Sequence, residues 1–321
     1  MELSFTKCHG SGNDFCLIDS RDLDLDDASW GRIARTLCDR AGPVGADGIL
    51  LLTPGDGASD FGMRVVNADG SEPETCLNGL RCVARAGFEA LGIDAARVRL
   101  KTSGAEVARE VELAPGVYTV RETVGPVATD PAAVGIRVAP PVIEAAVPGL
   151  PSDRAFTALA MPNPHLIAFV EKVDVAELVA LGQWCEAGPE LLVDRANVSF
   201  VEVRGSDPGS SPGLALFVQT FERGVGLTNA CGTAMAGSVH AAGLTGRLPF
   251  GEWLTVFNPG GRVRARAEGP AGGDRVTIAG NATFEWEGVV EVDPATGVAG
   301  AVRVVRRRGD EVAAWEGAVR N

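Results

Sequence analysis

Two cysteines, Cys76 and Cys231, each stand directly before a helical pattern in this chain of 321 residues. Each also follows a strand pattern and a polar turn. A helix N-terminus carries unpaired backbone N–H groups and the positive end of the helix dipole, so it favours a thiolate or a bound carboxylate. Two thiols on opposite faces of one α-carbon could remove a proton and return one. That chemistry is typical of a racemase or epimerase.

The other cysteines are interpreted as small core residues, because free cysteine is among the most buried residue types. Seven is an odd number, no C-x-x-C pair occurs, and the chain has three histidines. This pattern favours free thiols in a reducing cytoplasm and argues against a structural zinc site. The five cysteines in this group are Cys8, Cys16, Cys38, Cys82 and Cys185.

The composition is that of a globular protein, with 45% hydrophobic and 22% charged residues. A net charge of −13 argues against nucleic acid and anionic lipid as partners, since both attract clustered Lys and Arg. The N-terminal stretch lacks a signal-peptide pattern, and no apolar run reaches the length of a membrane span. We therefore expect a cytoplasmic protein. Neither a pyridoxal-lysine motif nor a complete nucleotide loop is present, so no cofactor is expected.

Short β-rich runs separated by Gly, Pro and Asp recur along the chain, and strands outnumber helical patterns. The similar sequence patterns around Cys76 and Cys231 suggest that the chain consists of two related halves. The loop at 127–135 is interpreted as the domain joint and residues 204–213 as an exposed hairpin insertion. Helices are predicted at 29–40, 77–91, 175–183 and 232–243.

The helix predicted at 77–91 is amphipathic, whereas the one at 232–243 lacks charged residues and is predicted to be enclosed by its domain. On the polar face of the first helix, Arg81 is interpreted as solvated or salt-bridged. Among other polar residues, His9 is expected to fix its loop, His240 to be a core histidine, and Asp69 to serve a turn.

Several ordered blocks resemble the diaminopimelate epimerase family, and the match runs from residue 5 to about 291. The resemblance implies an isomerase with an α/β (α+β) fold of two pseudo-symmetric domains. Each domain would be a mixed, strongly curved sheet wrapped around a central helix, with the active site in the cleft between them. The blocks are "KCHGSGNDFCLID" at 7–19, "GADGILLL" at 45–52, "NADGSEPETCLNGLRC" at 67–82, "MPNPHLIAFV" at 161–170, "RANVSFVEV" at 195–203, "FERGVGLTNACGT" at 221–233 and "NPGGRVRA" at 258–265.

The implied domains are residues 1–125 with about 279–292, which carry Cys76, and residues 126–278, which carry Cys231. Residues 293–321 form a C-terminal extension, which the sequence leaves open as a further strand pair or a partly ordered tail. The implied reaction converts LL-2,6-diaminopimelate to the meso form, in lysine and peptidoglycan precursor synthesis, without a cofactor or metal. The implied partner is a small-molecule amino acid, and a homodimer is compatible with the sequence.

The resemblance also assigns roles to individual residues. Cys76 and Cys231 would be the thiolate base and the thiol acid, exchanging roles in the reverse direction. His165 is interpreted as a supporting residue near the thiols. The residues that would surround the reacting centre are Asn13 and the backbone of Leu77, Asn78, Gly232 and Thr233. The residues that would bind the distal amino-acid end are Asn67, Asn163, Asn197, Glu222 and Arg223.

Two positions beside the thiols depart from the family pattern. Leu77 stands where glycine is common, and its side chain is expected to occupy space near the carboxylate site and to resist a positive φ. Leu227 stands where glutamate is common. Two alternatives therefore remain open: an epimerase or racemase for a different amino acid on the same fold, and a relative that binds an amino acid without catalysis.

Overall fold

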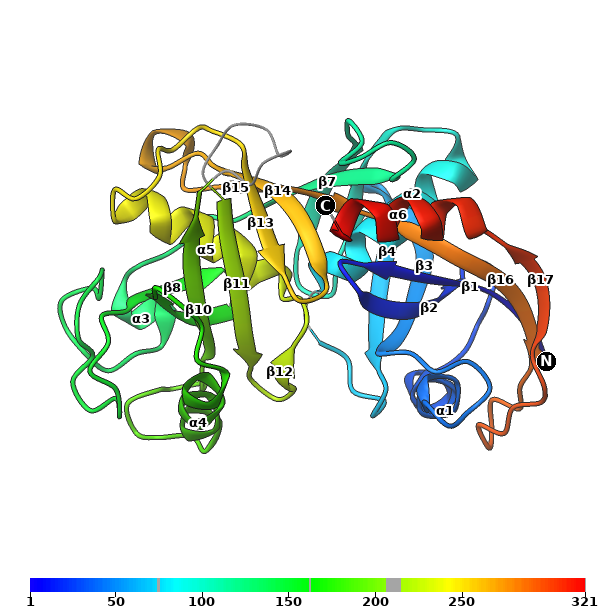
Figure 1. Cartoon of the computed structure of the whole chain (residues 1–321). Coiled ribbons are helices and arrows are strands. Elements are labelled where there is room, and N and C mark those ends of the chain that lie inside the picture. Colours follow the sequence, from blue (N-terminus) through cyan, green and yellow to red (C-terminus); the bar gives the residue numbers. More distant parts are fainter. Residues whose placement is uncertain (74–75, 162, 206–214, 321) are drawn as a thin grey trace. The chain divides into compact units, whose positions relative to one another are not determined.

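The protein divides into two compact units in a computed structural model that describes residues 1–73, 76–161, 163–205 and 215–320 (Figure 1). The first unit comprises Met1–Glu122 together with Ala279–Asn321, and the second is the continuous segment Thr123–Ile278. The chain thus passes between the units twice, within β7 (Thr119–Val124) and within β15 (Val276–Asn281). The loop at 127–135, interpreted as the domain joint, lies instead within the second unit, where it contains the short helix α3 (Pro131–Val134).

In the first unit, the described strands form a mixed sheet that includes two parallel pairs. β2 is parallel to β3, and β4 is parallel to β5. Each parallel pair is joined through a helix, as a parallel connection requires. In chain order the elements are β1 (Glu2–Gly10), β2 (Asn13–Asp19), α1 (Asp27–Cys38), β3 (Gly48–Asp56), β4 (Ser59–Asn67), α2 (Leu77–Leu91), β5 (Ala95–Arg99), β6 (Gly104–Arg109), β7, and later β16 (Thr283–Glu291).

The second unit repeats this order. Its first two strands, β8 and β9, form an antiparallel hairpin, and after a helix β10 pairs parallel with β9. β11 then pairs antiparallel with β10, and after a second helix β13 pairs parallel with β11. The two halves therefore share one topology, as the sequence predicted for a pseudo-symmetric fold. The elements are β8 (Thr157–Met161), β9 (Asn163–Phe169), α4 (Val175–Glu186), β10 (Asn197–Arg204), β11 (Ala215–Glu222), β12 (Gly226–Thr228), α5 (Gly232–Leu244), β13 (Leu254–Asn258), β14 (Gly261–Ala267), a 3-10 turn at Pro270–Gly272, and β15.

Each sheet encloses one helix and carries another outside. α2 contacts β1 through β6, and α5 contacts β8 to β11 and β14. α1 packs instead on β2, β3 and β4, and α4 packs on β10, β11 and β12. Asp26 and Asp174 are the N-caps of these two helices, where their side chains accept backbone N–H groups. α5 is buried over its first three turns, in agreement with its lack of charge. The helix that carries each predicted catalytic cysteine is therefore the central one.

The polar face of α2 is largely buried, and Arg81, which was predicted to be solvated or salt-bridged, forms a buried salt bridge. Asn78, Arg81 and Arg85 are buried along with the apolar side of the helix. Segments distant in sequence cover that face, because Arg81 bonds to Ser11 and to the carbonyl of Asn281. A helical pattern alone cannot reveal such covering segments.

The C-terminal segment adds β17 (Arg303–Arg307) and α6 (Gly309–Arg320) to the first unit. β17 pairs antiparallel with β16, and α6 packs on that same strand. Trp315 and Ala318 of α6 form a small apolar cluster with Val117. The extension is thus a strand and a helix. The predicted hairpin insertion at 204–213 lies largely outside the described residues, and no helix within the described ranges is both long and apolar enough to cross a membrane.

Candidate active site

Cys76 is the N-cap of α2, with an extended backbone (φ −145°, ψ 103°). The backbone N–H of Gly79 donates to its Sγ at 3.4 Å, so the sulfur satisfies one of the unpaired donors at the start of the helix. The thiol in turn faces Asn13 Oδ1 at 3.7 Å. The thiol is partly exposed, while the helix behind it is buried. A helix start aimed at a sulfur is the arrangement that stabilises a thiolate.

Asn13 and Asn78 lie together beside this thiol. Asn78 Nδ2 is 3.5 Å from Asn13 Oδ1, and Asn13 Nδ2 donates to Asp47 Oδ2 at 2.6 Å. Asp47 also accepts the backbone N–H of Asp14, so it holds the first residues of β2 in place. Asp47 was not among the predicted site residues, although it lies directly before the buried strand β3.

Asn67, predicted at the distal end of the substrate, ends β4. Its Nδ2 donates to Ser71 Oγ at 2.9 Å, within the turn that Asp69 closes by accepting both the N–H and the hydroxyl of Ser71. The backbone N–H of Ala68 donates to the carbonyl of Asp47. This turn therefore lies next to the residue that orients Asn13, and Asp69 has the turn role that was predicted.

Leu77 does not strain the helix start. It is the first residue of α2, its side chain is buried, and its φ is not positive. The expected conflict between leucine and a positive φ is therefore wrong for this chain. The leucine side chain is directed into the protein, while its backbone remains at the helix N-terminus.

Cys231 is the N-cap of α5, and it is buried. Its Sγ lies 3.4 Å from the hydroxyl of Thr233. That hydroxyl is also 3.1 Å from Nε2 of His165. The second thiol therefore belongs to a buried polar chain that runs from the sulfur through a hydroxyl to an imidazole.

His165 joins this chain to two of the predicted asparagines. Its Nε2 is 3.1 Å from Asn163 Oδ1 and 3.3 Å from Asn197 Nδ2. Burial, together with the smaller effect of the positive charge of Arg223, lowers the pKa of His165 to about 3. The imidazole is therefore neutral near pH 7, and it acts as a hydrogen-bonding group there rather than as a charge.

Glu222 lies beside the second thiol at the end of β11. Burial raises the pKa of its carboxyl, and the neighbouring Thr228 and Cys231 partly offset that rise. Burial also raises the pKa of Cys231 well above its usual value, and the negative charge of Glu222 raises it further; Thr233 and the backbone of Ala234 act in the opposite direction. Before substrate binds, Cys231 is therefore a protonated thiol at neutral pH.

Arg223 is adjacent to this cluster. Its backbone N–H donates to Asn197 Oδ1 at 2.9 Å, and its guanidinium donates to the carbonyl and the carboxylate of Asp194. Leu227, the second departure from the family pattern, is in β12 opposite Phe221 and is 45% exposed. Replacing glutamate there leaves Glu222 as the carboxylate beside Cys231.

The internal repeat makes several of these residues equivalent. Asn13 and Asn163 each begin the second strand of their unit. Asn67 and Glu222 each end the strand that precedes the cysteine-bearing segment. Each unit therefore brings a cysteine, a helix start and an amide side chain into one local cluster.

The remaining predictions for polar and sulfur residues are confirmed with one refinement. His9 accepts the backbone N–H of Gly12 and contacts Asn281, so it fixes its loop. His240 is buried 3.6 Å from the carboxylate of Asp274, and burial lowers its pKa. Arg81 is salt-bridged, to Glu122, but is not solvated. The five cysteines predicted as core residues are buried free thiols.

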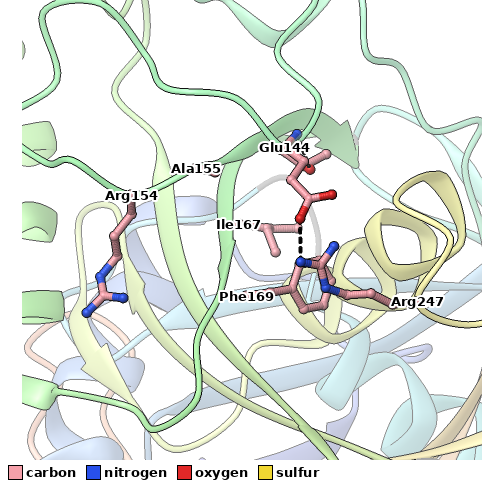
Figure 2. A pocket seen from close by; sticks show the side chains of 7 residues that line it. Glu144, Arg154, Ala155, Ile167, Phe169 and Arg247 are labelled. Carbon is pink, nitrogen blue, oxygen red and sulfur yellow. Dashed lines mark hydrogen bonds and ion pairs between the residues drawn. The ribbon is translucent and has the colours of Figure 1, made fainter.

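A cavity of about 140 Å³ in the second unit lies apart from these clusters (Figure 2). Figure 2 shows Glu144 and Arg247 joined by an ion pair, with Arg154 directed elsewhere. Arg154 is itself paired with Glu177, so both guanidinium groups are already neutralised. None of the predicted site residues lines this cavity. Within the described ranges, three or more His, Cys, Asp or Glu side chains do not gather as a metal site would need.

Comparisons with known proteins agree with the sequence blocks. The family model described as diaminopimelate epimerase matches residues 5–127. A diaminopimelate epimerase from Clostridium acetobutylicum is 37% identical over 91% of this chain and 87% of its own length. One from Lactiplantibacillus plantarum is 38% identical over 88% of each chain.

Solved structures share the fold at low sequence identity. A phenazine biosynthesis protein of the PhzF family from Bacillus anthracis matches with a TM-score of 0.65 and 16% identity, covering 91% of this chain and 100% of its own. A hydroxyproline epimerase from Agrobacterium vitis matches with a TM-score of 0.61 and 15% identity, covering 100% and 98%. With these relatives and the two repeated cysteine clusters, the chain belongs to the diaminopimelate epimerase family.

Proposed function

We propose that this protein interconverts LL-2,6-diaminopimelate and meso-2,6-diaminopimelate by a two-base mechanism that uses Cys76 and Cys231. The observation that carries the proposal is the repeated local arrangement: each unit presents a cysteine as the N-cap of its central helix, beside an asparagine or a glutamate. The family to which the chain belongs supplies the substrate class.

In the proposed reaction, the thiolate of Cys76 removes the α-proton from one face of the substrate. The electron pair of the broken C–H bond moves toward the carboxylate, whose growing charge is held by backbone N–H groups at the two helix starts. Cys231, which holds its proton because its pKa is raised, donates that proton to the opposite face. The reverse reaction exchanges the two roles.

Polar groups near Cys231 would bind the distal, non-reacting end of the substrate. A zwitterionic amino-acid end needs a guanidinium for its carboxylate and oxygen acceptors for its ammonium. Arg223, Glu222 and the amides of Asn163 and Asn197 are of those kinds and lie in one connected cluster. Asn67 of the first unit would complete the set. The amide of Asn13 and the helix starts would bind the reacting end.

The test is incubation of the purified protein with LL- and meso-diaminopimelate in deuterated water. The proposal expects deuterium at one α-carbon of each isomer, and Cys76→Ser or Cys231→Ser should abolish its incorporation. Cys82→Ala is the matched control, since Cys82 is on the same helix as Cys76 and is buried in the core. Absence of α-deuteration in the wild-type protein would refute the proposed function, and a panel of other free amino acids would then test the wider class.

A further inference from the structure

Arg81 is a fully buried cation on the central helix of the first unit. Its guanidinium makes four hydrogen bonds: to Glu122 Oε1 at 2.8 Å, to Asn78 Oδ1 at 2.8 Å, to Ser11 Oγ at 3.2 Å and to the carbonyl of Asn281 at 3.2 Å. All of these partners belong to the first unit. The guanidinium therefore joins four separate segments of one unit.

Stability alone is a poor explanation for this pair. Removing a guanidinium and a carboxylate from water is costly, and apolar residues of similar volume often serve a core as well or better. Burial raises the pKa of Glu122 to about 7, although the charge and hydrogen bond of Arg81 act against the rise. Its second oxygen, Oε2, has no hydrogen-bond partner within the described residues. Burying this ion pair therefore lowers the free energy of unfolding relative to a well-packed apolar core.

Two glycines make room for the guanidinium. A Cβ on Gly280 would lie 2.6 Å from Arg81 Nε. A Cβ on Gly10 would lie 2.5 Å from the backbone oxygen of Asn78 and 3.1 Å from Arg81 Nη2, so Gly10 makes room for the start of α2 as well as for the guanidinium. Ser11, the residue after Gly10, has a positive φ of 53°, and its N–H donates to Asn281 Oδ1. The backbone around the guanidinium is therefore shaped to receive it.

From Arg81, hydrogen bonds lead to the thiol. Arg81 orients Asn78 Oδ1, which leaves Asn78 Nδ2 directed at Asn13 Oδ1, the atom that faces the Cys76 thiol. Through Ser11, the same guanidinium holds the turn that leads into Asn13. It therefore fixes both amides beside the sulfur by separate routes.

The other two partners of Arg81 are on the strands that connect the units. Glu122 in β7 is the last residue of the first unit before the chain passes into the second, and Asn281 in β15 lies just after the chain returns. Both connecting strands are thereby fastened to the helix that begins after Cys76.

We propose that Arg81, held by Glu122, is the positioning residue for the Asn13–Asn78 pair beside Cys76, so that the buried ion pair sets the geometry of the carboxylate-binding side of the catalytic thiol. The catalytic part of this inference rests on the proposed function of Cys76. The geometric part concerns the folded protein alone.

Two variants of the full-length protein test the inference. Arg81→Lys keeps the charge, but a single ammonium lacks the planar fork that reaches four acceptors. Gly280→Ala keeps the arginine and displaces its guanidinium through the added Cβ. The matched control is Arg85→Lys: Arg85 is also buried on α2, one turn further along, and is ion-paired with Glu89 and Glu311.

The first readout is backbone amide hydrogen exchange, which needs no substrate. Arg81→Lys and Gly280→Ala should speed exchange in peptides that cover residues 9–14, while residues 84–91 keep wild-type protection. Arg85→Lys should leave residues 9–14 unchanged. Wild-type protection of residues 9–14 in both test variants would overturn the inference, whether or not the protein turns over diaminopimelate.

The second readout is the rate of α-deuteration. A displacement of about 1 Å in a catalytic group can cost on the order of 100-fold in rate, so kcat in Arg81→Lys should fall by about that factor, while Arg85→Lys stays close to wild type. If Arg81 acts through Asn78, the loss that Arg81→Lys adds to Asn78→Ala should be smaller than the loss it causes in the wild type, with the remainder due to the route through Ser11. Multiplying losses in the double variant would overturn the route through Asn78. Absence of deuteration in the wild type would refute the proposed function, and the amide exchange would still decide the geometric claim.

Discussion

Glu222 and Cys231 show how one side chain can set the acidity of another. The carboxylate lies beside the thiol at the end of β11, and its negative charge adds to burial in raising the pKa of Cys231. The resemblance to the family assigns Glu222 to the distal ammonium of the substrate. An ammonium bound at Glu222 would neutralise that charge, and the thiol would then lose its proton more easily. In the proposed function, substrate binding would therefore change the acidity of Cys231 through this residue.

Glu222→Gln should make Cys231 more acidic, because the substitution removes the negative charge and keeps an amide of similar size. Because the charge of Glu222 raises the pKa of Cys231, its removal should lower that pKa. Since iodoacetamide reacts with the thiolate, alkylation of Cys231 should then begin at a lower pH than in the wild type. Peptide mass spectrometry across pH 6 to 10 measures this. Glu202→Gln, in the same unit but paired with Arg204, is the control. An unchanged alkylation profile in Glu222→Gln would contradict the electrostatic link.

Residues that act through local features can be predicted from the sequence, whereas residues that act through distant partners cannot. Cys76 and Cys231 were found because a helix start is a local feature that neighbours in sequence reveal. For Arg81 the sequence allowed a solvated or a salt-bridged side chain and could not decide between them, because its partners Glu122 and Asn281 are 41 and 200 positions away. Asp47 was missed because its bond to Asn13 spans 34 positions. Contacts of this range depend on the whole topology, which a single helical or strand pattern does not contain.

At the scale of elements, α2 is fixed in place by an N-terminal segment and by the C-terminal helix α6. Its start is fixed by the segment that contains Ser11 and Asn13, and its middle is fixed by α6. Glu311 of α6 accepts two hydrogen bonds from the guanidinium of Arg85, which also stacks on the ring of Phe284. Trp315 of α6 lies against the ring of His9. The predicted bounds of α2 and α5 agree with the structure to within a residue, whereas the sequence did not decide the form of α6.

Glu311→Gln should destabilise the docking of α6 and leave the thiols in place. The substitution removes the charge that pairs with a guanidinium that is 4% exposed, and a hydrogen bond to a charged group contributes about 1.5–3 kcal/mol. We expect a loss of roughly 1–2 kcal/mol in the free energy of unfolding, measured by denaturant titration. Glu316→Gln breaks an exposed pair with Arg320 on the same helix and should lose a few tenths of a kcal/mol. Equal losses in the two variants would show that the Arg85 contact contributes no more than a surface pair.

At the scale of the whole molecule, one topology occurs twice. The order of hairpin, outer helix, parallel strand, antiparallel strand, central helix and parallel strand is the same in both units. The sequence revealed this repeat through two helix starts, because the rest of the two halves differs in composition. α2 carries buried arginines, while α5 is composed of small and apolar residues with one buried histidine. Similar backbones here enclose helices of different polarity.

Deletion of residues 303–321 should weaken the first unit selectively. The deletion removes β17 and α6 and uncovers Val117, His9 and Arg85. Amide hydrogen exchange should become faster across residues 1–122, while residues 123–278 keep their protection, because the second unit receives no residue from this segment. Equal acceleration in both units would show that they unfold as one cooperative body.

The discontinuity of the first unit also bears on how the chain folds as it leaves the ribosome. The second unit is a single continuous segment, so all of its residues are available as soon as residue 278 has emerged. The first unit is translated mostly beforehand, yet β1 must wait for β16, its partner from the far end of the chain. Until then, one edge of β1 stays unpaired and the face that α6 will cover remains open. The half that is made first is therefore completed last, and the edge of β1 stays open to pairing with other strands during synthesis.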